Sequence, residues 1–153
     1  MKKIFIDTNI FLNLLLNKDK SKDIYEFLDN NENELYTNTI VLNELRFQLL
    51  IQQASEKLKS NKKYEIIKYI KKNKNFREET LSKYISFFIN LKNLVKIIDI
   101  SLNDEIEICS ITIKYGLLPN DASILNSMYK EKIDYLYTYD NDFSNIDKIK
   151  IIN

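Results

Sequence analysis

The sequence predicts an α/β protein, a three-layer α/β/α sandwich built on a five-stranded parallel sheet. Short runs rich in β-branched and aromatic residues alternate along the 153 residues with segments whose apolar residues recur every three to four positions. The first run, Ile4–Ile6, is apolar throughout and stops at an acid, Asp7. Strands separated by helices form a parallel sheet with both faces covered. There is no internal repeat, so we expect a single domain over residues 1–153.

The N-terminal third of the chain predicts two strands and two helices. After the first strand, the apolar residues between Ile10 and Leu15 follow helical spacing, and either Thr8 or Asn9 can cap that helix. Helical spacing also extends over residues 21–31. The short run Leu35–Asn38 then reads as the second strand.

The middle of the chain predicts a helical insertion between the second and third strands. Thr39 is placed to cap a long helix that continues to about Leu58. Two further segments with helical spacing follow, over residues 64–70 and 81–91. The β-rich run Val95–Ile100 is then the third strand.

The next segment predicts a sixth helix. Ser101 can cap it, and Ile106, Cys109 and Ile113 are expected to face the core. Gly116 lies where a helix C-terminus needs a left-handed residue.

The last part of the chain predicts one more helix and two strands. Pro119 suits the first position of a helix, with Asp121 in its first turn. The runs Tyr135–Tyr139 and Ile149–Ile152 are expected to complete the sheet.

The composition excludes several catalytic chemistries. The chain has no histidine, so Ser-His-Asp catalysis, Cys-His catalysis and His-ligated zinc are excluded. One cysteine excludes a thiolate zinc site, and one glycine excludes a Gly-rich phosphate-binding loop. Catalysis must therefore use carboxylates, hydroxyls, amides and lysines. The net charge of +1 indicates no particular partner.

The sequence also indicates where the protein acts. No apolar run approaches the roughly 20 residues that span a bilayer, so no membrane partner is expected. The N-terminus lacks the apolar region of a secretory signal. A single cysteine fits a reducing compartment, and we expect a cytoplasmic protein.

Acidic residues stand where functional groups of open α/β sheets gather. Asp7 ends the first strand, Glu44 lies one turn into its helix, and Asp121 lies in a first helical turn. Asp140 and Asp142 follow the fourth strand. Strand ends and the helix starts after them share one edge of the sheet, so these acids can meet. Each also has an ordinary structural interpretation, as a cap, a first-turn acid, a turn residue or a solvated helix residue.

If these carboxylates meet, they require a cation. At about 5 Å and an effective dielectric of about 20, each like-charged pair costs roughly 3 kcal/mol. Oxygen ligands without histidine or cysteine suit a hard cation, Mg²⁺ or Mn²⁺. Such a site suits phosphodiester cleavage by a metal-activated water.

Four motifs together resemble those of PIN-domain ribonucleases in order and spacing, over nearly the whole chain. The motifs are Ile4-Phe5-Ile6-Asp7-Thr8-Asn9, Asn43-Glu44-Leu45-Arg46, Pro119-Asn120-Asp121-Ala122 and Thr138-Tyr139-Asp140-Asn141-Asp142-Phe143. The resemblance implies a single PIN-like nuclease domain with strand order 3-2-1-4-5, an Mg²⁺ or Mn²⁺ pocket and an RNA substrate. Many small members are VapC toxins of toxin–antitoxin pairs, which implies an antitoxin partner and a homodimer.

The resemblance also assigns roles to individual residues. It gives the catalytic and metal-binding positions to four acids, with Asp142 as an additional ligand. Those four acids are Asp7, Glu44, Asp121 and Asp140. It gives supporting roles to three polar residues, Thr8, Asn9 and Thr138.

The segment between Glu44 and Asp121 is longer than in the family pattern and is rich in lysine. Its basic side chains form either a solvated helix face or a clamp for the RNA backbone, since lysines bind phosphates without reading sequence. The residues that would bind RNA in the second case are Arg46, Lys62, Lys63, Lys71 and Lys72. Arg46 alternatively makes a local ion pair.

Two other functions fit the same motifs. One is a PIN-like module that binds RNA or a protein but does not cut. The other is a structure-specific DNA nuclease, because such enzymes use similar acid clusters.

Overall fold

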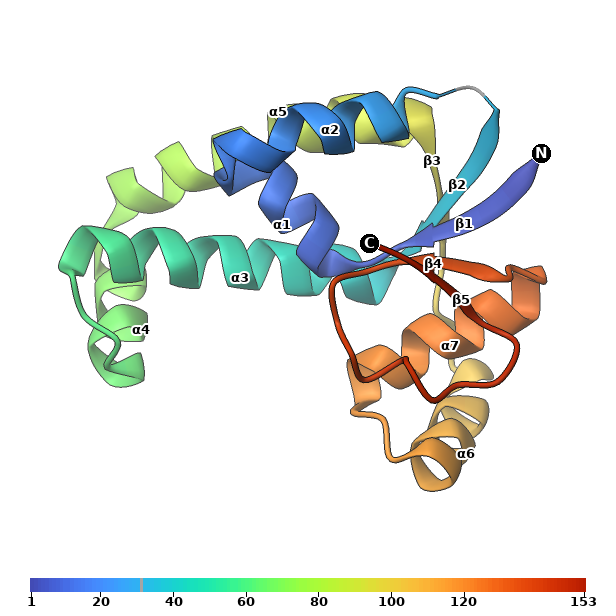
Figure 1. Ribbon diagram of the computed structural model, residues 1–153. Coiled ribbons are helices and arrows are strands. Elements are labelled where there is room, and N and C mark those ends of the chain that lie inside the picture. The colour runs from blue at the N-terminus through green and yellow to red at the C-terminus, as the bar shows by residue number, and fades with distance from the viewer. Residues whose placement is uncertain (31) are drawn as a thin grey trace.

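The computed structural model describes residues 1–30 and 32–153 and contains the predicted parallel sheet (Figure 1). The strand order is β3-β2-β1-β4-β5, and every neighbouring pair is parallel. The resemblance implied this order, and the structure confirms it. The strands are β1 Lys2–Ile6, β2 Asn33–Asn38, β3 Val95–Ile98, β4 Tyr135–Tyr137 and β5 Lys150–Ile152.

Helices cover both faces of the sheet and form the three predicted layers. In Figure 1, α1, α2 and α5 lie above the sheet, whereas α6 and α7 lie below it. The helices are α1 Thr8–Leu16, α2 Lys18–Leu28, α3 Thr39–Leu58, α4 Lys63–Lys72, α5 Lys74–Leu94, α6 Asp104–Tyr115 and α7 Pro119–Glu131. None of the described helices is both long and apolar enough to cross a membrane.

The central strand β1 anchors the core. Phe5 and Ile6 are fully buried between the two helical layers, which explains why the first run of the sequence is apolar throughout. Burying a side chain of this size contributes about 1.5 to 3 kcal/mol relative to leaving it exposed. The acid that follows β1 is therefore held at the centre of the sheet's carboxyl edge.

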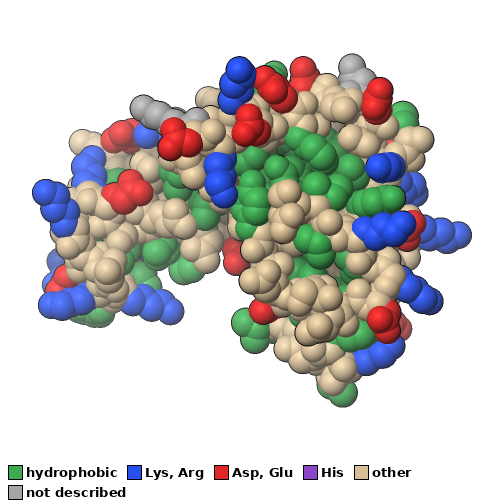
Figure 2. All heavy atoms as spheres, in the orientation of Figure 1, with side chains coloured by type: hydrophobic (Ala, Val, Ile, Leu, Met, Phe, Trp, Pro, Cys, Tyr) green, Lys and Arg blue, Asp and Glu red, His purple; other side chains and the backbone are tan. Residues whose placement is uncertain are grey.

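The insertion between β2 and β3 consists of α3, α4 and α5, as the sequence predicts. The far end of α3 packs against α4 and α5 through a second, smaller core of Ala54, Ile66 and Phe76. This part extends as an arm away from the sheet (Figure 1). Figure 2 shows lysine and arginine side chains around its outer end, and the surface is hollowed between the arm and the side that carries α6 and α7.

Two helix caps lie earlier in the chain than predicted. Asp7 caps α1 in place of Thr8 or Asn9, and its carboxylate accepts a hydrogen bond from the Thr8 backbone N–H. Asn38 caps α3 in place of Thr39, and its Oδ1 accepts from the Val41 N–H at 2.8 Å. Both cap residues have extended backbone, because each stands at the end of a strand, directly before the first residue of its helix.

Helix α6 faces the core with other residues than predicted. Ile106 is 74% exposed, Ile113 is 86% exposed and Cys109 is exposed, whereas Ile108 and Ile111 are buried. Apolar residues occupy both faces of this helix, so periodicity alone does not determine which face packs inward. The predicted inward face was wrong.

The start of α6 also differs. The helix begins at Asp104, and Ser101 does not cap it. Instead, the backbone N–H and the hydroxyl of Ser101 both donate to the Asp104 carboxylate at 2.7 Å. Gly116 at the other end has φ +71° and is the left-handed terminator that the sequence predicts.

Candidate active site

Asp7 is the most deeply buried acid of the site. Its side chain lies at the end of β1 and is 6% exposed. One oxygen accepts from the Thr8 N–H at 2.6 Å, and the other accepts from the Thr138 hydroxyl at 2.7 Å and the Asn9 amide at 2.8 Å. Three donors therefore fix both carboxylate oxygens. The three residues expected to support the site all contact or adjoin Asp7.

Asn9 and Thr138 connect the ends of β1 and β4. The Asn9 amide also donates to the Thr138 hydroxyl at 3.0 Å, and its carbonyl accepts from the Tyr139 N–H at 3.1 Å. The Thr138 hydroxyl accepts from the Asp140 N–H at 2.9 Å. A single hydroxyl thus touches Asp7 and the backbone of Asp140, which places these two acids beside one another.

The other two acids come from helix starts. Glu44 lies in the second turn of α3, and Asp121 lies in the first turn of α7. The Asn120 amide donates to Glu44 Oε2 at 2.8 Å and joins the two helices. The four expected acids line one cavity of about 180 Å³. The lining residues are Asp7, Thr8, Asn9, Leu12, Glu44, Gln48, Asp121 and Asp140.

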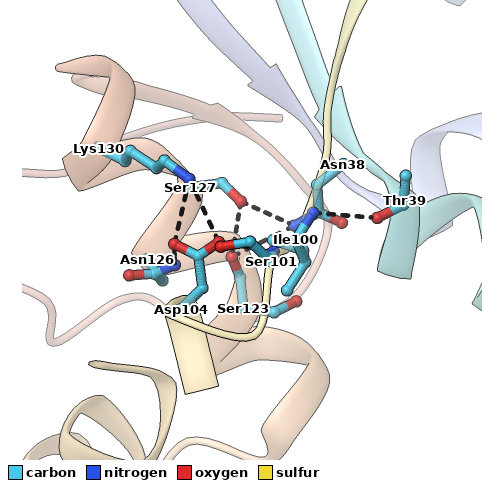
Figure 3. A network of polar contacts seen from close by, with 9 residues as sticks. All are labelled: Asn38, Thr39, Ile100, Ser101, Asp104, Ser123, Asn126, Ser127 and Lys130. Carbon is cyan, nitrogen blue, oxygen red and sulfur yellow. Dashed lines mark hydrogen bonds and ion pairs between the residues drawn. The ribbon is translucent and has the colours of Figure 1, made fainter. Parts of the chain in front are cut away.

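A polar network fixes α3 against α7 (Figure 3). The side-chain amide of Asn38, which is fully buried, donates to the Ser127 hydroxyl at 3.0 Å and to the Ser123 carbonyl at 3.2 Å. The same side chain caps α3 through its oxygen. The helix that carries Glu44 and the helix that carries Asp121 are therefore held by one side chain.

The same close-up shows a buried acid that does not belong to the cavity (Figure 3). Asp104 accepts from Ser101, from Asn126 at 3.3 Å and from Lys130 at 3.1 Å. Hydrogen bonds from Ser101 are the main reason that the pKa of Asp104 lies well below its usual value. A carboxylate with so many donors is structural, and it joins α6 to α7.

The cavity is electrostatically unfavourable for carboxylates without a cation. Burial raises the pKa of Asp7 to about 6, against the opposing effect of its hydrogen bonds. Burial and then the negative charge of Asp7 and Asp140 raise the pKa of Asp121 to about 7. Neighbouring groups with such raised pKa values often mark functional sites.

The donor set fits a hard divalent cation. One carboxylate oxygen from each of Asp121, Asp140 and Asp142 lies within 4.8 Å of the others. The buried Thr8 hydroxyl belongs to a residue that lines the same cavity as Asp121 and Asp140, and it has no hydrogen-bond partner among the described residues. Oxygen ligands alone suit Mg²⁺ or Mn²⁺. The backbone N–H of Asp142 donates to Asp140 Oδ1 at 2.9 Å, which keeps these two acids together.

The basic residues expected to bind RNA lie away from the acids. Lys62, Lys63, Lys71 and Lys72 are exposed on or beside α4, at the outer end of the arm. In Figure 1, α4 lies at the outer end of α3, away from the strands. Lys62 makes an exposed ion pair with Glu65 at 3.3 Å. This arrangement matches a solvated helix face, and a role in RNA binding stays a prediction.

Arg46 is the basic residue nearest Glu44 in the sequence, but the local ion pair expected for it is wrong. Its guanidinium donates to the Asn43 side chain at 3.1 Å and lies 5.8 Å from the centre of the Tyr84 ring. Among the described residues it has no acidic partner within salt-bridge distance.

Sequence reasoning missed three polar residues of the site. Asn120 orients Glu44, Asn38 fixes α3 against α7, and Gln48 lines the cavity. Asn120 stands inside one of the quoted motifs, and Gln48 lies one helical turn after Glu44, so both had a local signal. Asn38 had none, because its partners lie 85 and 89 residues further along the chain.

The fold and this site define a class, namely α/β proteins with a carboxylate pocket at the carboxyl edge of a parallel sheet. The family model of the PIN domain matches residues 4–149. This chain belongs to the PIN-domain family.

Relatives and solved structures agree with that assignment. The chain is 33% identical to Ribonuclease VapC2 of Methanocaldococcus jannaschii, over 98% of this chain and 93% of that protein. It is 30% identical to Ribonuclease VapC6 of the same organism, over 97% of this chain and 95% of that protein.

VapBC2 from Rickettsia felis, solved with a DNA fragment from its promoter, superposes with a TM-score of 0.62 at 22% identity, over 99% of this chain and 98% of that chain. VapC20 of Mycobacterium tuberculosis, described as a Sarcin-Ricin loop cleaving toxin, gives 0.60 at 16% identity, over 92% of each chain.

Proposed function

We propose that this protein is a Mg²⁺- or Mn²⁺-dependent endoribonuclease that hydrolyses RNA phosphodiester bonds. The observation that carries the proposal is the convergence of Asp7, Glu44, Asp121 and Asp140, from four separate elements, on one cavity. Two relatives that are at least 30% identical over nearly their whole length are named ribonucleases, which supports RNA as the substrate.

Asp121, Asp140 and Asp142 would hold the cation, with Asp7, Glu44 and the Thr8 hydroxyl lining the same space. A divalent cation there supplies a Lewis acid that lowers the pKa of a bound water and offsets charge at the scissile phosphate. The chain itself positions the groups. Asn9 and Thr138 hold Asp7, and Asn120 holds Glu44.

Two alternatives remain separable by experiment. A PIN-like module without activity needs no complete set of acids, yet all four expected acids lie in the cavity. A structure-specific DNA nuclease would use the same acids, and the names of the two ribonuclease relatives favour RNA over it.

The proposal extends to the biological role. Several structures with this fold are toxin–antitoxin complexes, including VapBC2 from Rickettsia felis and a complex from Klebsiella pneumoniae. We infer that this protein is the toxin of such a pair, that it binds a cognate antitoxin and forms a homodimer, and that it acts on RNA in the cytoplasm.

Cleavage of a labelled structured RNA tests the proposal. Wild type is compared in Mn²⁺ and in EDTA, beside Asp7→Asn in Mn²⁺. Asp134→Asn is the matched control, because Asp134 is exposed at the opposite end of β4 and its carboxylate makes no hydrogen bond among the described residues. We expect cutting by wild type and Asp134→Asn with Mn²⁺ only, and a loss of at least about a hundredfold in Asp7→Asn.

Three results would contradict the proposal. Cutting that survives both EDTA and Asp7→Asn rules out the acidic-site mechanism. RNA binding with Mn²⁺ but without cutting points to the non-catalytic module. Faster cutting of a DNA oligonucleotide of the same sequence points to the DNA nuclease.

A further inference from the structure

A second cavity adjoins the acidic one, in the groove between α1 and α3. It measures about 580 Å³, within the range of sites that hold ligands of small-molecule size. Leu12 lines both cavities, so the groove leads directly away from the acids. The two helices pack together along this line (Figure 1). The lining residues of the second cavity are Leu12, Asn13, Leu16, Asn17, Asp19 and Gln52.

The α1 wall of the groove is a ladder of side-chain amides. Asn9, Asn13 and Asn17 are spaced four residues apart and so share one helix face. The Asn13 side-chain amide donates to the backbone carbonyl of Asn9 at 2.8 Å, and the Asn17 side-chain amide donates to Asn13 Oδ1 at 3.2 Å. These bonds hold the wall in a fixed orientation.

The α3 wall carries two side-chain amides that make no hydrogen bond to any group that the structure describes. Gln48 lines the acidic cavity and Gln52, one turn later, lines the second cavity. Neither side chain makes a hydrogen bond with the side chains or backbone groups that the structure describes. Gln48 is half-buried and Gln52 is exposed, so both amides are open to a ligand. Each offers one acceptor and two donors.

The lining chemistry favours nucleobases over phosphates. Among the side chains that the structure describes, no lysine or arginine lines either cavity, and the charged group in the second cavity is the acid Asp19. Amides pair in a bidentate way with base edges, most typically with adenine. Leu12 and Leu16 offer apolar contact to a base face. Proteins that read RNA sequence bind unpaired bases through such stacking and edge contacts.

A protein segment fits this groove less well. A partner helix binds through an apolar groove that receives its apolar face. Four of the six residues that line the second cavity are amides or an acid. The polar lining therefore favours a ligand that presents hydrogen-bonding edges.

We propose that the groove between α1 and α3 binds one or more unpaired bases of the RNA next to the scissile phosphate, with Gln48 and Gln52 reading their edges. The inference rests on the proposed ribonuclease function, and it adds the place in the fold where bases beside the cut would bind. Base selection would then depend on uncharged side chains, separate from the acids that perform the chemistry.

Binding is measured first, so that the result does not depend on cleavage. Fluorescence anisotropy measures the affinity for labelled 12-nucleotide RNAs in Mg²⁺, one single-stranded and one fully paired. All proteins in this binding assay carry Asp121→Asn, so that the RNA is not cut. Gln52→Leu keeps the side-chain size but removes the amide. Gln53→Leu is the matched control, because Gln53 is the next residue of α3 and lines neither cavity. We expect Gln52→Leu to weaken binding of the single strand by about five- to tenfold and binding of the duplex hardly at all.

Cut sites are then mapped with Mn²⁺ on an RNA pool of random sequence. The proteins in this cleavage assay keep Asp121 and differ only at Gln52 or Gln53. Wild type and Gln53→Leu should share a base preference beside the cut, and Gln52→Leu should lose it. Equal affinity of all variants for the single strand would overturn the inference and leave the groove to a protein segment. Equal loss for single strand and duplex would also overturn it, because that pattern indicates backbone contact. An absence of any cutting would count against the proposed function alone, because the binding measurement does not depend on cleavage.

Discussion

At the scale of single residues, the site depends on uncharged side chains as much as on its acids. The Thr138 hydroxyl is buried, donates to Asp7 and accepts from the Asp140 backbone and the Asn9 amide. It is the contact between the two acids that end β1 and β4. Groups that orient metal ligands in this way typically change metal affinity or activity 10- to 100-fold when they are removed.

Thr138→Val tests this role, because valine keeps the shape of threonine and removes the hydroxyl. We expect RNA cleavage to fall about 10- to 100-fold and Mn²⁺ affinity, measured by calorimetry, to fall with it. The free energy of unfolding should decrease by about 1 to 3 kcal/mol, because one oxygen of Asp7 loses a donor. Thr112→Val is the control, since the Thr112 side chain, on α6, makes no hydrogen bond among the described residues. Unchanged cleavage in Thr138→Val would show that Asp7 needs no such support.

At the scale of helices and strands, Asn38 decides how α3 lies against α7. Most N-cap side chains serve one helix, and that of Asn73 is an ordinary case, since it accepts from the Phe76 N–H at 3.0 Å and caps α5. Asn38 caps α3 in the same way but also donates to two groups of α7. Comparing substitutions of Asn38 and Asn73 therefore distinguishes a loss of stability at a helix end from a loss of alignment between Glu44 and Asp121.

Asn38→Ala should cost about 2 to 4 kcal/mol of unfolding free energy, because it removes a cap and leaves buried partners unsatisfied. Asn73→Ala should cost about 1 kcal/mol. Urea unfolding measures both. We expect RNA cleavage under folded conditions to fall in Asn38→Ala only, since Glu44 and Asp121 lose their alignment there. A comparable fall in both variants would mean that stability alone, rather than alignment, limits cleavage.

At the scale of the whole molecule, the carboxylates give stability two opposite pH dependences. Asp104 has a lowered pKa, so its contribution is present above the unfolded pKa near 3.8 and is lost as the pH falls below it. Asp7 and Asp121 have raised pKa values, about 6 and about 7. Their folded forms bind more protons than their unfolded forms, so they destabilise the fold as the pH rises from about 4 through about 7.

Thermal unfolding in EDTA should therefore show a melting temperature that decreases between pH 5 and pH 8. With an allowance for solvent screening at Asp121, the loss is on the order of 1 to 2 kcal/mol, or roughly 2 to 8 °C. Asp121→Asn should flatten this decrease. Mn²⁺ at pH 8 should raise the melting temperature of wild type more than that of Asp121→Asn, because the cation binds the folded form. A melting temperature that rises between pH 5 and pH 8 in EDTA would contradict the raised pKa values.

The sequence by itself determined the strands, the helices and the elements that carry the acids. Period-two and helical patterns are local, so Ile4–Ile6, the insertion and the left-handed Gly116 could all be placed without coordinates. Strand ends and helix starts share one edge in a parallel α/β sheet, which is why the four acids could be expected to meet. Their order along the chain also indicated the family.

Only the tertiary structure decided the contacts between distant residues. The inward face of α6 was ambiguous because apolar residues lie on both sides, and packing against α7 buried Ile108 and Ile111 rather than Ile106 and Ile113. The partners of Asn38 and the groove between α1 and α3 depend on segments far apart in the chain. Sequence spacing reports the period of a helix, whereas the side chain that a given face meets depends on how the whole chain packs.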